Sequence, residues 1–191
     1  MEDVLTYPSD DEQFDVLISD VKPEDLPGRV SQALGVPYLS GMQVRANAVE
    51  GVIVNTKGSK LRALVTLPVS ARGQSVATHF IFCTGAPHSY VALSVLKALG
   101  VPEVSFGAEV VRLNGVKANL GVSDTFKVSS KDGEELCNFV GLNVLGMDYL
   151  DRAAIKLEID MPANRVVFTS TQFPAAARQG PATPKRSLCF G

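Results

Sequence analysis

The most informative stretch of the chain is residues 80–91, which read Phe80-Ile81-Phe82-Cys83-Thr84-Gly85-Ala86-Pro87-His88-Ser89-Tyr90-Val91. The apolar and aromatic residues at its start predict a buried strand. The small residues and the proline that follow predict a loop. A helix is expected next, over residues 91–99, because Gly100 and Pro102 follow it as stop signals. The stretch therefore predicts a strand, a loop and a helix in succession.

A second informative stretch lies about sixty residues further on and reads Asn143-Val144-Leu145-Gly146-Met147-Asp148-Tyr149-Leu150. A short helix is expected at its end, around residues 148–152. The rest of the segment 42–171 consists of short runs rich in Val, Ile, Leu, Phe and Thr, separated by turn residues, which is typical of strands. The expected strands are 44–48, 51–55, 63–69, 75–82, 109–113, 120–128, 137–141, 155–159 and 165–169. Many strands with one or two short helices predict an all-β fold closed into a barrel.

The two ends of the chain differ from this body in composition. Residues 1–25 carry nine acidic residues and a single lysine, so we expect residues 1–41 to form an acidic N-terminal extension and linker. Within it, apolar residues at helical spacing predict a short amphipathic helix that either packs on the body or docks into a partner; they are Phe14, Leu17, Ile18 and Val21. Residues 172–191 are expected to be a disordered tail, which leaves 42–171 as the folded domain.

The composition argues against several classes of protein. A chain of 191 residues, 46% hydrophobic and 20% charged, fits one globular domain with tails. Its net charge of -2 argues against nucleic-acid binding. Three cysteines at uneven spacing (Cys83, Cys137 and Cys189) suit neither a disulfide framework nor a zinc site, so we expect no metal, no cofactor and a reducing compartment. Without a signal peptide or a bilayer-spanning run, a soluble, intracellular and cytoplasmic protein with no membrane partner is expected.

Taken together, in this order and spacing, the two stretches resemble the retropepsin-like aspartic proteases, the family of retroviral and retrotransposon proteases and their cellular relatives. Residues 81–89 resemble the family's loop of two hydrophobic residues followed by Asp-Thr-Gly-Ala-x-x-Ser, and residues 144–150 resemble its Ile-Leu-Gly-x-Asp-x-Leu segment. The resemblance covers roughly residues 42–171. It implies a closed β-barrel (acid protease) subunit, a homodimer, and a peptide or protein substrate in the cleft.

The chain departs from the family at one position, because Cys83 stands where the family has its catalytic aspartate. In the family each subunit supplies one aspartate, and the two carboxyls share a proton. A thiol is a poor hydrogen-bond donor and has no second oxygen to relay a proton, so we expect hydrolysis to be lost or nearly so. Cys83 is either natural, or introduced to silence an active enzyme, or the site of new chemistry with His88 as a base. A Cys83–Cys83 bridge across the dimer axis would be reachable on oxidation.

The resemblance assigns roles to the other matching positions. Thr84 would bond across the dimer axis, Gly85 would let the backbone approach substrate because it has no side chain, and Ala86 would contact substrate. Ser89, Leu145 and Gly146 would support the loop, with Asp148 bracing the helix that follows. Ser89 could equally cap the helix that begins near Val91.

A hairpin with the turn Asn114-Gly115 falls where the family has its flap. Asn114, Gly115 and Val116 are therefore expected to contact substrate as part of a mobile lid, and the alternative is an ordinary surface hairpin.

The function expected from the sequence is that of a retropepsin-type aspartic endopeptidase domain, inactive or nearly so because Cys83 replaces the catalytic aspartate. The alternative is a non-enzymatic homodimeric peptide-binding or interaction module derived from a retroelement protease. The charge contrast with the body also suggests that the acidic extension is a propeptide that occludes the cleft.

Overall fold

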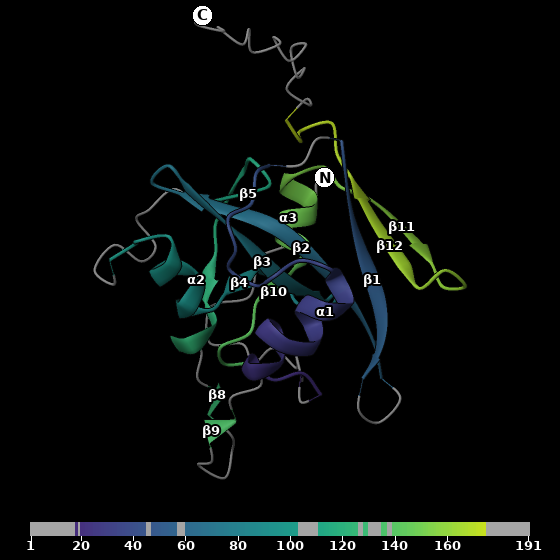
Figure 1. Cartoon of the computed structure of the whole chain (residues 1–191), viewed down its shortest axis with the longest axis horizontal. Coiled ribbons are helices and arrows are strands. Elements are labelled where there is room, and N and C mark those ends of the chain that lie inside the picture. The colour runs from purple at the N-terminus through teal and green to yellow at the C-terminus, as the bar shows by residue number, and fades with distance from the viewer. Residues whose placement is uncertain are drawn as a thin grey trace, which may run out of the picture.

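The computed structural model describes residues 18, 20–44, 47–56, 60–102, 111–125, 128–129, 135–136 and 139–174. In this part of the chain, ten strands form one mixed sheet, and β8 (Val128–Ser129) pairs with β9 (Glu135–Leu136) in a second, small sheet. The helices are short: η1 (Pro23–Asp25), η2 (Leu26–Val30), α1 (Ser31–Leu34), α2 (Leu93–Ala98), η4 (Ser123–Thr125) and α3 (Met147–Arg152). Figure 1 shows the sheet at the centre, with α1 in front of it and α2 and α3 at other sides. The fold is therefore mostly β, as the sequence predicts.

The sheet is organised around β2 (Lys60–Ala71). This strand pairs antiparallel with β1 (Ala48–Thr56) on one side and with β3 (Gln74–Phe82) on the other. Its C-terminal end also pairs with β5 (Val111–Leu113), which forms a hairpin with β6 (Val116–Ala118).

Two arms extend the sheet from this centre. Beyond β1 lie β12 (Arg165–Thr169) and then β11 (Lys156–Asp160). Beyond β3 lie β10 (Val144–Leu145), β4 (Tyr90–Val91) and β7 (Gly121–Val122). The β3–β10 and β4–β7 pairs are parallel, so two segments distant in the sequence meet side by side.

The expected closure into a barrel is wrong for the strands that the structure describes. The sheet has two ends, β11 and β7, and these two strands are not paired with each other. A barrel needs every strand to have a neighbour on both sides around a ring. Here β2 pairs with β1 along its first half and with β5 near its end, so the sheet branches and its arms diverge (Figure 1).

Apolar side chains cover both faces of the central strands. One face contributes Val49, Val65 and Phe80 to a main core, which α2, α3 and the β5–β6 hairpin cover. The opposite face contributes Leu64 and Ile81 to a second core. The complete second core consists of Ile18, Val21, Leu26, Val30, Leu64, Ile81, Ala86, Tyr90, Phe139, Leu142 and Val144. Burial on both faces explains why the central strands are apolar along nearly their whole length.

The N-terminal segment covers the second core and corrects two expectations. Residues 23–34, expected to belong to a linker, form the helical turns η1, η2 and α1, with Leu26 and Val30 buried. Ile18, Asp20 and Val21 lie in no helix, although an amphipathic helix was expected there; Phe14 and Leu17 lie outside the described residues. Ile18 and Val21 are nonetheless buried, so Ile18 and residues 20–34 pack on the body of their own chain.

Other boundaries also differ from the expected ones: the strand expected over 51–55 begins at Ala48, and residues 139–141, expected to belong to a strand, form a bend and a turn. The helix expected from residue 91 begins at Leu93, because Tyr90 and Val91 pair with β7 as strand β4. The strand expected over 120–128 is interrupted by η4. Phe173, placed in the expected tail, is buried in the main core, while residues 175–191 lie outside the described residues. The short helix expected around 148–152 is confirmed as α3.

Among the helices of the described segments, none has the length and apolar character needed to cross a bilayer.

Candidate functional site around Cys83

The loop that follows β3 carries Cys83 at its base. The Cys83 N–H donates to the Leu145 carbonyl at 3.1 Å, and the Ala86 N–H donates to the Cys83 carbonyl at 3.2 Å, which closes a tight turn. Thr84 and Gly85, at the tip, are exposed, whereas Ala86 is buried. Cys83 itself is half-buried, with its side chain against the second core. The loop thus presents a small polar tip and anchors both of its ends.

The second stretch predicted from the sequence lies directly beneath this loop. Val144 and Leu145 run parallel to Ile81 and Phe82 in the sheet. At the start of α3, the Met147 N–H donates to the Ala86 carbonyl at 2.9 Å and the Asp148 N–H donates to the Pro87 carbonyl at 3.0 Å. The loop and the first turn of α3 therefore share backbone hydrogen bonds, although about sixty residues separate them in the sequence.

Gly146 occupies the closest point of this contact. A Cβ at residue 146 would lie 2.2 Å from the His88 carbonyl oxygen and 2.8 Å from that of Ala86. No side chain fits at such distances, so only glycine lets the two segments approach this closely.

Ser89 joins the two segments through its side chain. Its hydroxyl donates to Asp148 Oδ1 at 2.6 Å and accepts the Gly146 N–H at 3.0 Å. It does not cap α2. The N-terminus of α2 is capped instead by Asp124, whose Oδ2 accepts the Leu93 N–H at 2.6 Å. Of the two roles expected for Ser89, its contacts match support of the loop and not capping of α2. Asp148 takes part in this support by accepting the Ser89 hydroxyl at the start of α3.

Asn143 is a supporting residue to which the sequence analysis gave no role. It is fully buried; its Oδ1 accepts the Ala92 N–H at 2.7 Å, and its Nδ2 donates to the His79 carbonyl at 3.0 Å and to the Tyr38 hydroxyl at 3.0 Å. One side chain thus ties the start of α2 to β3 and to the N-terminal segment. The signal available in the sequence was a polar amide residue, Asn143, immediately before the apolar Val-Leu-Gly run.

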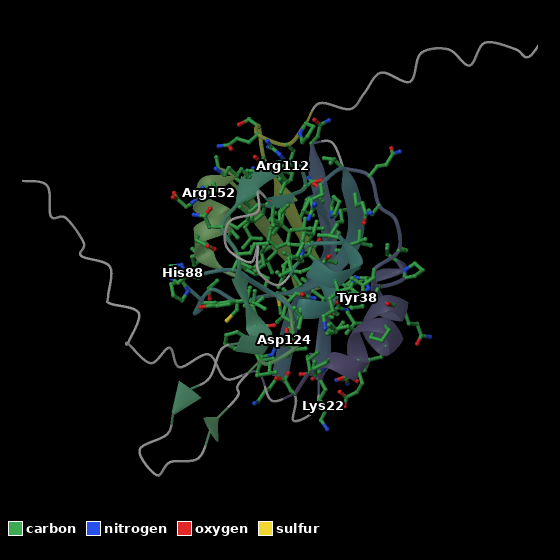
Figure 2. The ribbon with its side chains drawn as sticks, turned by 90° about the vertical axis from the view of Figure 1, so that its left-hand side faces the viewer. Lys22, Tyr38, His88, Arg112, Asp124 and Arg152 are labelled. Carbon is green, nitrogen blue, oxygen red and sulfur yellow. The ribbon has the colours of Figure 1, made fainter. Side chains whose placement is uncertain are left out.

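His88 lies at the surface beside Asp148, and Figure 2 shows it at the edge of the molecule. Its Nδ1 is 4.0 Å from Asp148 Oδ2, and its side chain is half exposed. His88 thus lies within ion-pair distance of a carboxylate of α3. Among the described residues, no group of three His, Cys, Asp or Glu side chains is arranged to hold a metal ion.

The hairpin that was expected to be a flap forms, but it does not lie over the Cys83 loop. Asn114 and Gly115 have positive φ angles of 45° and 84°, as a tight hairpin turn requires. Asn114 is fully buried, and its N–H donates to the Pro68 carbonyl at 2.8 Å. Pro68 pairs with Ala77, near the end of β3 opposite to Cys83.

The distance between the Asn114-Gly115 turn and the Cys83 loop follows from the geometry of β3. Six residues separate Ala77 from Cys83, which corresponds to roughly 20 Å along a strand. Within one chain, the structure therefore does not bring Asn114, Gly115 or Val116 to the Cys83 loop. It packs this turn as a buried corner of the sheet instead of leaving it as a free lid.

The sequence did not predict the ion pair between Asp20 and Arg62, which lies near Cys83. Arg62 precedes Ala63, which pairs with Phe82, and Cys83 is near enough to Arg62 to contribute to the raised pKa of its guanidinium. Arg62 donates to both carboxylate oxygens of Asp20, from Nη2 at 2.6 Å and from Nε at 3.0 and 3.2 Å. The guanidinium of Arg62 lowers the pKa of Asp20 to about 2, and the carboxylate raises the pKa of Arg62 in return. The sequence predicts that the acidic extension and the body differ in charge. No local pattern of residues, however, predicts that Asp20 pairs with Arg62.

No family model matches the sequence, and no curated protein and no solved structure matches the chain. The resemblance to the retropepsin-like proteases therefore rests on the residues of the two stretches themselves.

Proposed function

We propose that this chain is one protomer of a homodimeric, retropepsin-type domain that holds extended peptides but has lost hydrolysis because Cys83 replaces the catalytic aspartate. The loop 83–86 of each protomer would meet its mate at the dimer axis.

One observation carries the proposal: the two stretches that resemble the family are joined by hydrogen bonds. The pairs are Cys83 with Leu145, Ala86 with Met147, and Pro87 with Asp148. Such contact is what the resemblance requires, since in the family the Leu-Gly segment packs against the active-site loop. If the two stretches resembled the family's motifs only by chance, contact between them in the fold would not be expected.

The exposure of the loop also favours the proposal. Thr84 and Gly85 are exposed at the tip, while Ala86 and Ser89 are buried below it. The polar threonine and the side-chain-free glycine are thus available to a second protomer and to a substrate backbone, and the anchoring residues are not.

The chemistry of sulfur explains the expected loss of activity. Peptide hydrolysis by two carboxyls needs one to accept a proton from water and the other to donate one to the scissile carbonyl. A thiol offers one weakly donating S–H and no second oxygen. General acid–base assistance is worth about 10² to 10⁴ in rate, so its loss removes at least that factor.

The test is the variant Cys83→Asp, with Cys83→Asn as the matched control of similar shape. Cleavage of a fluorescently labelled, unfolded polypeptide is measured near pH 5, with and without an aspartic-protease inhibitor. We expect the aspartate variant to cleave at least 100-fold faster than the native chain and the asparagine variant, and the inhibitor to abolish the gain.

A folded, dimeric Cys83→Asp variant without inhibitor-sensitive cleavage would contradict the lost-peptidase proposal. That result would favour the non-enzymatic peptide-binding module. Circular dichroism and sedimentation at the assay pH establish whether the variant is folded and dimeric.

A further inference from the structure

The contact between Asp20 and the body is unusually complete for an ion pair. Asp20 is 6% exposed, and its carboxylate accepts three hydrogen bonds from Arg62 and one from the Thr56 hydroxyl. The Asp20 carbonyl also accepts a bond from Arg29 Nη2 at 2.9 Å. Both the side chain and the backbone of this residue are thus recognised by groups from β1, β2 and η2.

Apolar side chains flank the recognised carboxylate. Ile18 and Val21 are each 3% exposed and pack in the second core with Leu64 and Ile81 of the sheet. Residues 18–21 therefore present one acid between two aliphatic anchors, and a matching surface receives all three. A charged group at the centre and apolar contacts around it are what a specific peptide site requires.

The site is larger than its present occupant. A cavity of about 180 Å³ opens beside Val21 and is bounded by Val30, Val54 and Leu64, with Arg29 at its side. This apolar space would accept a longer side chain at the position that Val21 now fills.

The helical turns that follow have contacts of their own besides those to Asp20 and Val21. The Lys22 N–H donates to Asp25 Oδ2 at 2.8 Å, and Leu26 and Val30 are buried. Release of Ile18, Asp20 and Val21 would break the Arg29–Asp20 bond, and the Lys22–Asp25 bond and the burial of Leu26 and Val30 would remain to hold η1 and η2. Figure 2 marks the junction, where Lys22 lies at the lower end of the covered face.

We propose that Arg62, Thr56 and the adjoining apolar surface form a binding site for an extended peptide that carries a carboxylate between aliphatic side chains, and that residues 18–21 occupy this site in cis. A partner segment with the same pattern and a larger residue after the acid displaces them. The site does not depend on the proposed function, because its recognition involves neither hydrolysis nor the dimer axis.

The test uses the full-length chain and a fluorescein-labelled peptide with the sequence of residues 16–25. In the native chain the cis segment competes with the peptide. Asp20→Asn weakens the cis contact, so we expect the peptide to bind this variant at least 10-fold more tightly than the native chain, measured by fluorescence anisotropy. Glu24→Gln removes an exposed acid of the same segment and serves as the matched control, with native-like affinity.

Two altered peptides test the recognition itself. A peptide with Asn in place of Asp20 should bind the Asp20→Asn chain at least 10-fold more weakly, and a peptide with Leu in place of Val21 should bind it more tightly. Equal binding of the acid and amide peptides, or no gain from Asp20→Asn, would overturn the proposal.

Hydrogen exchange in the native chain keeps the proposal testable if the Asp20→Asn variant does not fold. Excess peptide should accelerate exchange at the Val21 amide and leave the Lys22 amide, which donates to Asp25, and α3 unchanged. Unchanged exchange at Val21 with saturating peptide would also overturn the proposal. Peptide binding is read independently of cleavage, so its failure is distinct from failure of the Cys83→Asp experiment.

Discussion

Gly146 is the residue at which the contact between the two stretches is most demanding. A Cβ at residue 146 would lie 2.2 and 2.8 Å from two backbone carbonyl oxygens, which cannot rotate away as a side chain would. Substitution must therefore push the loop 86–88 away from α3, and the hydrogen bonds from Met147 and Asp148 lengthen with it.

We expect Gly146→Ala to lower the free energy of unfolding by about 1–3 kcal/mol, the usual cost of overpacking. Gly41→Ala is the matched control, because a Cβ at residue 41 meets nothing within 4 Å. Urea denaturation of both variants provides the comparison. Equal, small losses would mean that the loop and α3 are not held together as described.

At the scale of elements, a buried histidine links the N-terminal segment to the sheet. His79 of β3 is fully buried; its Nε2 lies 3.0 Å from Ser31 Oγ of α1, and its Nδ1 lies 2.9 Å from Thr66 Oγ1 of β2. Ser31 Oγ donates to the Leu26 carbonyl and so accepts from the imidazole, which leaves Nδ1 to accept from Thr66. The network is complete with a neutral ring.

Burial lowers the pKa of His79 to about 4, below its ordinary value of 6.5. The unfolded chain therefore binds a proton in this interval and the folded chain does not, so stability falls as the pH drops from 6.5 towards 4. We expect a loss of about 3 kcal/mol at pH 4 relative to neutral pH. Urea unfolding at several pH values measures it, with His79→Gln as the reference. The same slope in both proteins across this interval would refute the assignment.

The elements also differ in how well the sequence predicts them. The strand before Cys83, the helix after it, α3 and the Asn114-Gly115 hairpin follow from local residue patterns, and all four are present. The helical turns over 23–34 were missed because Pro23, Pro27 and Gly28 break the local pattern, while burial of Leu26 and Val30 against the sheet stabilises them. Long-range packing outweighs local propensity at such sites.

The residues of the candidate site also fall into two groups, those that the sequence predicted and those that it did not. Cys83, Ser89, Leu145 and Gly146 were placed by the resemblance, and the structure brings them together. Asp20 and Arg62 lie 42 positions apart in the sequence, and no spacing rule predicts that they pair. The hairpin was predicted as an element, but its packing against Pro68 depends on the branching of the sheet at β2.

In the whole molecule, the tip of the Cys83 loop is exposed, while Ile18 and residues 20–34 cover the face of the central strands that lies opposite the main core. The described part of the N-terminal extension therefore packs against the second core as part of the body. In the proposed dimer, the exposed tips of two such loops would lie against each other, with the two sulfurs close to the axis.

Thiol cross-linking in solution tests this arrangement most directly. In a chain with Cys137→Ser and Cys189→Ser, Cys83 is the remaining cysteine. A sulfur pair at the axis requires Cα atoms within about 7 Å, so mild oxidation should convert most of the protein to a covalent dimer that reducing agent dissolves. Cys83→Ser should abolish it. If the protein sediments as a dimer and still gives no Cys83–Cys83 bridge under oxidation, the two loops do not meet at an axis and the proposed retropepsin-type dimer is wrong.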